Sequence, residues 1–459
     1  MLFIGIDLGT SFIKGAVLDL DKLSLSHIRR VPFPEPVAGL PSLFYEVEPL
    51  QVVSAFKVLV AELLSYAPNC AGLVMCSQMH SLVLTNDRGN PLSNCITWQD
   101  QRVLLPHPSG AGSYFDLLSS RLSPAEQQQL GRELKPSLPL CYLFWLAEER
   151  ELPQGRIIPA ALPDFVLAHL SGATPEIGLT NAASHGAINL ETLDWHHEVI
   201  AKLGLERLQW PAVRPFGGPA AQIEIGSTLL PCYTPVGDHQ CAITGAFLGY
   251  DELSLNIATA SQVTMLTPEL RLGHYQTRPF FDGRFMNTIA RIPAGRSLNV
   301  LIDLLSELAR AQGVELDDPW PYITGAAAAV PETGLQVDLA FFASSVGDRG
   351  QIANIQEDNL TVGHLFRAAF QNMAENYYNC ALRLSPKPDW ERLVFSGGLV
   401  QKLEPLRQAI TQKFQLGHRL SASSEDTLLG LLALALVASG RVPSVEAATT
   451  LLLEQYEEA

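Results

Sequence analysis

The N-terminal stretch Leu2–Leu20, LFIGIDLGTSFIKGAVLDL, carries the pattern from which we infer the fold class. Its apolar and β-branched residues partly alternate, which predicts two strands joined by a tight turn at Gly9, Thr10 and Ser11. A glycine in such a turn lets the backbone approach an anion closely, and the N–H groups and hydroxyls that follow it donate to phosphate oxygens. Asp7 ends the first strand and is a candidate ligand for Mg²⁺, through water, because Mg²⁺ sheds its hydration shell reluctantly.

Lys14 follows this turn and has two interpretations. It either adds positive charge to the phosphate site or is an ordinary solvated strand residue, and the pattern alone favours the second. The bare pattern D-x-G-T occurs in many turns, but its place directly after an N-terminal apolar strand favours phosphate binding. The sequence contains no G-x-x-x-x-G-K-[ST] loop, which argues against a P-loop nucleotide hydrolase.

A weaker copy of this stretch lies later in the chain, at Leu255–Ala260. LNIATA places Thr259 where Thr10 stands in IDLGTS, again between strand-like segments. Either two β-turns agree by coincidence, or two similar domains each offer a hairpin to the same ligand. Strand-like and helix-like segments alternate along the chain, which favours α/β layers. We therefore expect an N-terminal domain over residues 1–247 and a C-terminal domain over residues 248–459.

Composition and charge exclude several classes of protein. The 459 residues carry 31 Lys and Arg against 47 Asp and Glu, a net charge of −16, and no basic stripe, which disfavours nucleic acid and anionic membranes as partners. This negative field also repels ATP, so a nucleotide site has to rely on backbone amides and a metal ion. The seven cysteines show no C-x-x-C pair, which is typical of free thiols in a reducing compartment. The N-terminus does not resemble a signal peptide, and we expect a cytoplasmic protein.

Two polar segments in the first half are candidates for binding a small polyhydroxy substrate. Sugars are recognised by polar side chains at their hydroxyls and by an aromatic ring against their C–H faces. A plain structural interpretation, which spacing alone favours, makes the tryptophan a core residue, the Asp–Arg pair a surface ion pair and the histidine a satisfied buried imidazole. The candidates are Gln78, Met79 and His80 in SQMH, and Trp98, Asp100 and Arg102 in TWQDQR.

Asp238 and a Gly-Gly pair complete the candidate chemistry. Asp238 follows Gly237 after an apolar stretch, where a carboxylate can accept the proton of an attacking hydroxyl; the alternative is a turn aspartate bonded to its own backbone. Gly397 and Gly398 follow a predicted strand and leave room for a flat base against the backbone. An ordinary strand–helix connection explains these glycines equally well.

Taken together and in this order, these segments resemble the FGGY family of carbohydrate kinases. The resemblance rests on GIDLGTS, QMH, TWQDQR, GDHQ, NIATASQ, VGDRG, FSGGLVQ and EDTLLGLLALA, which span the chain from residue 5 to about residue 435. Any one of these motifs is weak evidence of kinship, whereas eight in the same order are strong. Within the family, TWQDQR, LTNAASHG followed by Trp195, and NIATASQ are most similar to kinases of ketoses.

The resemblance implies an α/β fold with two actin-like ATPase domains, each built on a ribonuclease-H-type sheet, around a central cleft. It implies ATP and Mg²⁺ as cofactors, a sugar as substrate and Asp238 as the catalytic base. Asp7 helps to hold Mg²⁺ in such a site, and the QMH and TWQDQR segments line the sugar. It assigns to the nucleotide and its phosphates the residues Gly9, Thr10, Ser11, Lys14, Thr259, Gly397 and Gly398.

Four positions depart from the family pattern, namely Ser81, Ala258, Ala260 and Gln371, and they leave the choice of substrate open. The acceptor hydroxyl, regulation and the oligomeric state, including a homodimer, are open as well.

Two functions of other classes compete with a sugar kinase. One is a non-catalytic protein that senses sugar or nucleotide on the same scaffold, against which the presence of Asp7 and Asp238 argues. The other is a chaperone- or actin-like ATPase, in which TWQDQR and QMH have no role.

Overall fold

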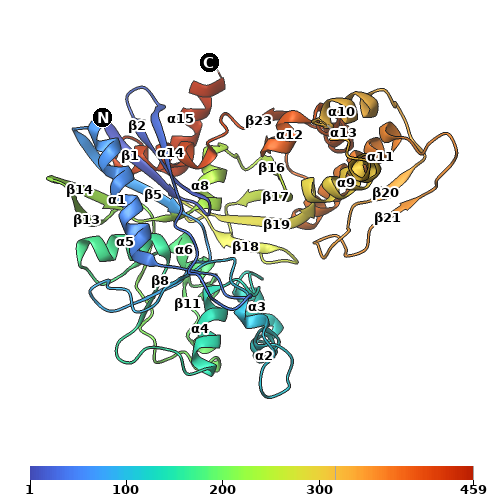
Figure 1. The fold of residues 1–459 in the computed structure, drawn as a ribbon. Helices are drawn as coiled ribbons and strands as arrows, with labels where there is room; N and C mark the ends of the chain where they lie inside the picture. Colours follow the sequence, from blue (N-terminus) through green and yellow to red (C-terminus); the bar gives the residue numbers. More distant parts are fainter. Residues whose placement is uncertain (316, 458–459) are drawn as a thin grey trace. The chain divides into compact units, whose positions relative to one another are not determined.

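The computed structural model describes residues 1–315 and 317–457 and divides them into two compact units (Figure 1). The first unit contains Met1–Phe247, and two later segments return to it: Pro268–Met286 and the described residues from Glu425 onward. The second unit contains Leu248–Thr267 and the described part of Asn287–Ser424. The first break lies between Phe247 and Leu248, and the chain after it is shared between the two units.

The sheet of the first unit grows from the predicted N-terminal hairpin. β1 (Leu2–Leu8) and β2 (Phe12–Asp19) pair antiparallel, and the order β3–β2–β1–β5–β14–β13 adds strands on both sides. β5 (Cys70–Ser77) runs parallel to β1, and the short β15 (Val236–Gly237) runs parallel to β5. The carboxyl ends of β1, β5 and β15 consequently meet at one edge of this sheet, where ligands of open α/β sheets commonly bind.

The sheet of the second unit repeats this plan. β16 (Glu252–Ile257) and β17 (Ala260–Thr267) pair antiparallel as β1 and β2 do, and β16 runs parallel to β22 (Arg392–Ser396) as β1 does to β5. Within the second unit the strand order is β19–β17–β16–β22–β23. The sequence echo is thus a duplicated hairpin, and each unit has the ribonuclease-H-type core that the resemblance implies.

The other elements connect these two sheets and flank them. In the first unit they are β3 (Ser24–Pro32), β4 (Glu46–Val47), α1 (Pro49–Tyr66), β6 (Val83–Thr85), β7 (Cys95–Ile96), η1 (Arg102–Leu104), α2 (Tyr114–Arg121), α3 (Pro124–Gln129), α4 (Pro139–Glu148), β8 (Ile158–Ala160), α5 (Leu162–Ser171), β9 (Ile177–Gly178), α6 (Leu179–Ser184), β10 (Ile188–Asn189), β11 (Asp194–Trp195), α7 (His197–Lys202), β12 (Val213–Arg214), β13 (Pro219–Ile225), β14 (Thr228–Tyr233), α8 (Asp238–Gly245), β18 (Gln276–Pro279), α14 (Asp426–Ala438) and α15 (Val445–Glu457). The later elements are β19 (Phe285–Pro293), α9 (Gly295–Ala311), α10 (Trp320–Ala328), β20 (Gln336–Asp338), β21 (Gln351–Ala353), α11 (Val362–Leu384), α12 (Gly398–Lys402), α13 (Glu404–Phe414) and β23 (Gly417–Leu420).

Helices α1 and α14 cover opposite faces of the first sheet. Ile4 and Ile6 of β1 belong to the same buried cluster as Phe56 of α1, whereas a Cβ on Gly5 would meet Leu431 of α14 at 3.3 Å. Alternate residues of a strand point to opposite faces, so the two helices sandwich β1. By length and composition α1 is the one described helix that is apolar enough to cross a membrane. Its buried apolar side chains pack on the sheet, so we interpret it as a core helix.

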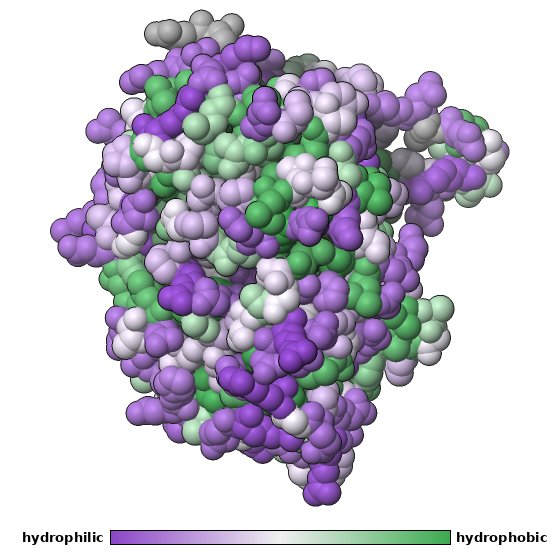
Figure 2. All heavy atoms as spheres, turned by 90° about the vertical axis from the view of Figure 1, so that its left-hand side faces the viewer, coloured by the Kyte–Doolittle hydropathy of each residue, from purple (hydrophilic) through white to green (hydrophobic). Residues whose placement is uncertain are grey.

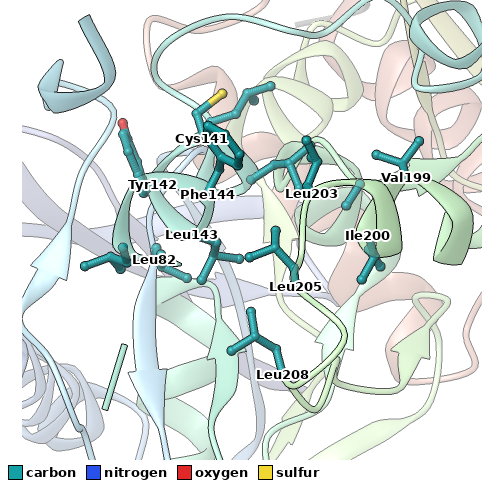
Figure 3. Packing of buried hydrophobic residues seen from close by; sticks show 14 of the residues in the cluster. Leu82, Cys141, Tyr142, Leu143, Phe144, Val199, Ile200, Leu203, Leu205 and Leu208 are labelled. Carbon is teal, nitrogen blue, oxygen red and sulfur yellow. The ribbon is translucent and has the colours of Figure 1, made fainter. Parts of the chain in front are cut away.

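A second hydrophobic cluster supports the loops beside the sheet edge (Figure 3). It includes residues of α2, α4 and α7 and of the segment that follows α7. Ile96 and Val103 belong to the same cluster, so the segment between them, which carries TWQDQR, is anchored at both ends. The surface in Figure 2 carries hydrophilic and hydrophobic residues side by side, as is usual for folded proteins.

Helices α8 and α14 approach each other at two glycines. A Cβ on Gly245 of α8 would lie 1.8 Å from the carbonyl oxygen of Asp426, and one on Gly430 of α14 would lie 2.0 Å from the carbonyl oxygen of Cys241. Atoms do not approach that closely without a shift of backbone, so only hydrogen fits at these positions. This close contact packs Cys241 and Gly245 of α8, the helix that begins with Asp238, against Asp426 and Gly430 of α14.

Gly430→Ala should therefore lower the free energy of unfolding by about 1–3 kcal/mol, the usual cost of forcing extra carbon into a packed interior. The measurement is the shift of the urea-unfolding curve relative to wild type. Gly325→Ala is the control, because Gly325 lies inside α10 with nothing within 4 Å of its Cβ position. That change should raise stability by about 0.5–1 kcal/mol, since alanine is the better helix former. Equal effects of the two substitutions would contradict the close contact.

Candidate functional site

The carboxylate of Asp7 is buried at the end of β1 with one oxygen unused. Its Oδ2 accepts a hydrogen bond from Thr427 Oγ1 at 2.8 Å. Within the described part of the chain, Oδ1 has no hydrogen-bond partner. Burial, as the main cause, raises the pKa of Asp7. A buried oxygen without a partner is costly, and it is explained if a cation or its bound water takes the free position.

The turn after Asp7 connects the predicted phosphate residues with the predicted sugar residues. Gly9, Thr10 and Ser11 link β1 to β2, and a Cβ on Gly9 would lie 2.9 Å from the carbonyl oxygen of Phe12. Thr10 Oγ1 donates to Gln78 Oε1 at 3.2 Å and accepts from Trp98 Nε1 at 3.0 Å. One hydroxyl thus joins the turn to both polar segments that the sequence singles out.

Lys14 is on β2 and forms an ion pair with a carboxylate outside the glycine turn. Its Nζ forms an ion pair with Glu425 Oε2 at 3.0 Å, and Arg30 Nη2 lies 3.6 Å from the other oxygen of Glu425. The charge of Lys14 is therefore already compensated. Its assignment to the phosphate site stays a prediction.

Asp238 is the first residue of α8 and directly follows β15. Its backbone is held in place because the N–H of Gly237 donates to Thr180 Oγ1 at 3.0 Å. Leu8 and Gly237 lie opposite the same residue of β5, Ser77, so β1 and β15 end at the same level. Asp7 is the next-to-last residue of β1, and Asp238 directly follows β15. Burial, followed by the negative charge of Asp7, raises the pKa of Asp238 to about 7. A carboxyl group with that pKa can take up and release a proton near neutral pH.

Gln78, Met79 and His80 follow β5 at the same edge. Gln78 Nε2 and His80 Nε2 are buried and have no hydrogen-bond partner among the described residues. His80 adopts a left-handed backbone conformation with φ +63°, and its N–H donates to Ser184 Oγ at 3.5 Å. Burial lowers the pKa of His80 well below its usual value, so the ring is neutral. Two buried polar nitrogens without partners are typical of a site that hydrogen-bonds a polar ligand.

The TWQDQR segment divides into an exposed tryptophan and a buried ion pair. The side chain of Trp98 is 43% exposed and its N–H binds Thr10, so one ring face is open to a ligand. Asp100 is fully buried and binds Arg102 Nε at 2.9 Å, Arg102 Nη2 at 2.7 Å and the Tyr45 N–H at 2.7 Å. Arg102 also packs over the ring of Phe44. Asp100 and Arg102 thus organise the loop from within, and nothing in this geometry adds support to their predicted contact with substrate.

The sequence analysis missed three residues beside Asp238 and Met79. Arg278 pairs with Glu133, and Arg278 Nη1 lies 2.8 Å from Nδ1 of His239. Arg278 comes from the segment Pro268–Met286, which the chain returns to the first unit. A lone arginine in TRPFF carries no motif, so sequence offered no signal for it.

The second unit has a pocket of about 520 Å³ at the carboxyl ends of β16 and β22. Thr259 of the β16–β17 turn and Gly398, the first residue of α12, both line it. Gly397 has φ +90°, and a Cβ there would lie 2.5 Å from the carbonyl oxygen of Ile257, so this position requires glycine. The predicted residues of the second unit therefore lie together, joined by lining residues that sequence did not indicate: Gly295, Asn299, Asp318, Trp320, Pro321, Thr324, Leu399, Lys402 and Leu403.

Two of the departures from the family pattern have structural explanations. Ser81 is buried and its hydroxyl accepts a hydrogen bond from the Leu162 N–H at 3.1 Å, so it stabilises the start of α5. Gln371 of α11 lines a different pocket, with Arg367 and Lys413. Ala258 lines the pocket of Thr259 directly.

Comparison with known proteins agrees with this geometry. Residues 2–230 match the model of the N-terminal domain of the FGGY family of carbohydrate kinases. Sedoheptulokinase of Mus musculus is 22% identical over 463 residues, which cover 90% of this chain and 92% of that protein. Among solved structures, xylulose kinase from Rhodospirillum rubrum superimposes with a TM-score of 0.83 at 19% identity, over 98% of this chain and 92% of that one. Plasmodium falciparum glycerol kinase with ADP gives a TM-score of 0.83 at 17% identity, over 98% and 92%.

The likeness to these structures shows a two-domain, actin-like fold with ribonuclease-H-type sheets, as the resemblance implies. The matched N-terminal region contains the hairpin of Asp7, the QMH segment and the TWQDQR loop. The chain therefore belongs to the FGGY family of carbohydrate kinases, phosphotransferases that use ATP and an alcohol group as acceptor.

Proposed function

We propose that this kinase phosphorylates a ketose, with sedoheptulose as the first candidate and sedoheptulose 7-phosphate as its product. Two observations support this choice. The match to sedoheptulokinase extends over nine-tenths of both chains, and TWQDQR, LTNAASHG with Trp195, and NIATASQ resemble sedoheptulokinase segments. A xylulokinase or a ribulokinase-like kinase of pentuloses or polyols is the alternative, since relatives act on xylulose and glycerol.

The proposed chemistry rests on one observation, the convergence of Asp7 and Asp238 at the ends of strands that pair with β5. Asp238 acts as the general base: its carboxylate accepts the proton of the acceptor hydroxyl while that oxygen attacks the γ-phosphorus of ATP. Gln78 Nε2 and His80 Nε2, which have no hydrogen-bond partner among the described residues, would bind sugar oxygens, and the exposed ring of Trp98 would cover C–H groups. Most of the rate enhancement then comes from alignment of the reactants.

Mg²⁺ fits the residues around Asp7. The free Oδ1 is a hard oxygen donor of the kind that Mg²⁺ prefers, directly or through water. When bound with the nucleotide, the ion would neutralise the charge on the transferred phosphoryl group. Asp7 holds the ion in this proposal, and Thr427 keeps Oδ2 oriented so that Oδ1 stays free.

For the nucleotide we propose the pocket of Thr259 and Gly398, so that the first unit binds sugar and the second binds ATP. The backbone of the β16–β17 turn suits phosphates. Gly398 suits a flat base, because a Cβ there would have no neighbour within 4 Å. Gly9, Thr10 and Ser11 of the first unit stay predicted phosphate residues. A cytoplasmic location and a homodimer stay predictions.

A non-catalytic sensor on the same scaffold is the rival of another class. The raised pKa of Asp238 and the free oxygen of Asp7 favour catalysis, because a binding protein has no use for a base poised near neutral pH. Release of ADP only when sugar is present would exclude both the sensor and a partner-driven ATPase.

The acceptor is tested with a panel of ketoses and polyols. We expect sedoheptulose to give the highest kcat/KM in a coupled ADP assay, ahead of xylulose, ribulose and glycerol, by a factor of about 10 or more, since a correctly paired hydroxyl contributes strongly to discrimination. Comparison by kcat/KM avoids the bias of a single concentration. A higher kcat/KM for xylulose would replace sedoheptulose by the pentulose alternative and keep the base assignment.

Asp238→Asn tests the base. The substitution keeps the shape but cannot accept a proton, so kcat should fall by about 10²–10⁴-fold while nucleotide affinity is unchanged. Because the pKa of Asp238 lies at about 7, the wild type should lose activity as pH falls below 7, when the carboxylate becomes protonated, and reach a plateau above it. The variant should lack this acid limb. Asp19→Asn is the control, since Asp19 lies at the far end of β2 and accepts from the Asp21 N–H. Normal turnover by the Asp238→Asn variant would exclude this base.

Asp7→Asn tests the metal. The amide is a weaker ligand without negative charge, so the Mg²⁺ concentration that gives half-maximal activity should rise by about 10-fold or more. Thr427→Val is the matched control, because it removes the partner of Oδ2 and leaves the carboxylate in place. Its Mg²⁺ requirement should change much less. An unchanged requirement in the Asp7→Asn variant would remove Asp7 from the metal site.

A further inference from the structure

The LTNAASHG segment contains α6 and lies beside β15, the short strand that ends directly before Asp238. A Cβ on Gly178, the residue before α6, would lie 2.1 Å from the carbonyl oxygen of Pro235, so the two backbones touch there. Thr180 and Asn181 follow in the first turn of α6, and their side chains are 5% and 1% exposed. Both side chains bind the segment that leads to Asp238.

The hydrogen bonds of these two side chains hold the peptides on both sides of Val236. Thr180 Oγ1 accepts a hydrogen bond from the Gly237 N–H at 3.0 Å. Asn181 Nδ2 donates to the carbonyl oxygen of Pro235 at 3.2 Å. One side chain therefore binds a donor of the segment and the other binds an acceptor, which restricts both its sliding and its rotation. We call these two contacts the clamp.

Asp164 of α5 orients the amide of Asn181. Its Oδ2 accepts from Asn181 Nδ2 at 3.1 Å, and its Oδ1 accepts from the Gly178 N–H at 3.0 Å. Asn181 Nδ2 thus lies between a carboxylate oxygen and the carbonyl oxygen of Pro235. Since neither oxygen of this pair donates as a carboxylate or a carbonyl, the amide has to present its NH₂ group to them.

The segment before Asp238 is incompletely packed, so its hydrogen bonds matter more. Two separate cavities of about 260 Å³ each are both lined by Gly178, Thr234 and Pro235. Atoms that border a cavity lack van der Waals partners on that side. Packing therefore contributes less to the position of this segment than in a close-packed interior, and the clamp contributes more.

We propose that Thr180 and Asn181 are positioning residues for the base, because they fix the backbone from which the carboxylate of Asp238 extends. This role rests on the proposed function, in which Asp238 accepts the proton of the acceptor hydroxyl. A displacement of about 1 Å between reacting groups can cost about 10²-fold in rate. Loss of the clamp should therefore lower kcat and leave the binding of sugar and ATP nearly unchanged.

Thr180→Val tests the clamp with little change of shape, because valine keeps the branched side chain and cannot accept from the Gly237 N–H. We expect kcat to fall by about 10- to 100-fold, with the KM values of sugar and ATP within about 2-fold of wild type. Thr180→Ser keeps the acceptor and should restore most of the activity. Asn181→Leu removes the other half of the clamp and should also lower kcat rather than raise KM.

Thr85→Val is the matched control for the loss of a buried threonine hydroxyl. Thr85 is fully buried in the first unit, and its Oγ1 donates to the carbonyl oxygen of Ile158 in β8 at 3.1 Å. Its replacement removes one buried hydrogen bond without touching β15, so kcat should stay close to the wild-type value. A loss of kcat equal to that of Thr180→Val would show general damage and contradict a specific clamp.

A double variant shows whether Thr180 acts through Asp238. In the Asp238→Asn background no carboxylate is left to be positioned, so adding Thr180→Val should lower the residual kcat by less than about 2-fold. The same fractional loss in both backgrounds would overturn the inference. An unchanged kcat in the folded Thr180→Val protein would overturn it as well.

Hydrogen exchange of the full-length protein measures the clamp without turnover. The amide of Gly237 should exchange faster in Thr180→Val than in wild type or in Thr180→Ser, and an unchanged exchange rate would contradict the clamp. Should Thr180→Val fail to fold, Thr180→Ala takes its place in every measurement, since alanine lacks the hydroxyl and adds no bulk. If Asp238→Asn turns over normally, the proposed base fails, and the exchange rate still decides whether Thr180 holds the segment.

Discussion

The close contact between α8 and α14 fixes how these two helices lie against each other beside the first sheet. Gly245 and Gly430 let the two backbones meet at distances that leave no room for a side chain. Cys241 Sγ donates to the carbonyl oxygen of Thr427 across the same contact, at 3.1 Å. As a result Asp238, at the start of α8, and Thr427, which binds Asp7, are held against the same sheet edge. A looser pair of helices would leave the two carboxylates without a fixed spacing.

The chemistry of the candidate site depends on polar atoms that are buried but not fully hydrogen-bonded. Asp7 Oδ1, Gln78 Nε2 and His80 Nε2 are buried without a partner in the described part of the chain. Each such atom costs free energy in the absence of a ligand, and a protein tolerates the cost mainly at functional sites. By contrast, Asp100 and Arg102 satisfy one another in the interior and hold their loop in shape. Within this one motif, Trp98 has an exposed ring, whereas Asp100 and Arg102 are buried and paired with each other.

The duplicated hairpin explains why two distant stretches of sequence resemble one another. In each unit the first strand has an antiparallel neighbour on one side and a parallel neighbour on the other, so a turn with threonine faces the carboxyl ends of the parallel pair. The two units differ in the elements that surround these strands. The first adds the cluster of Figure 3 beneath the polar loops, and the second adds the pocket of Thr259 and Gly398.

Local patterns were enough to predict the α/β class, the two hairpins, Asp238 at a strand end and the glycine at 397, because strand periodicity and turn chemistry act over a few neighbouring residues. Three further features became visible in the folded chain alone: Lys14 pairs with Glu425, Asp100 and Arg102 lie in the interior, and residues 268–286 return to the first unit with Arg278. These outcomes depend on partners between 2 and 411 positions away in the chain. Even for the nearest pair, burial is set by distant segments such as Tyr45 and Phe44, which no local pattern records.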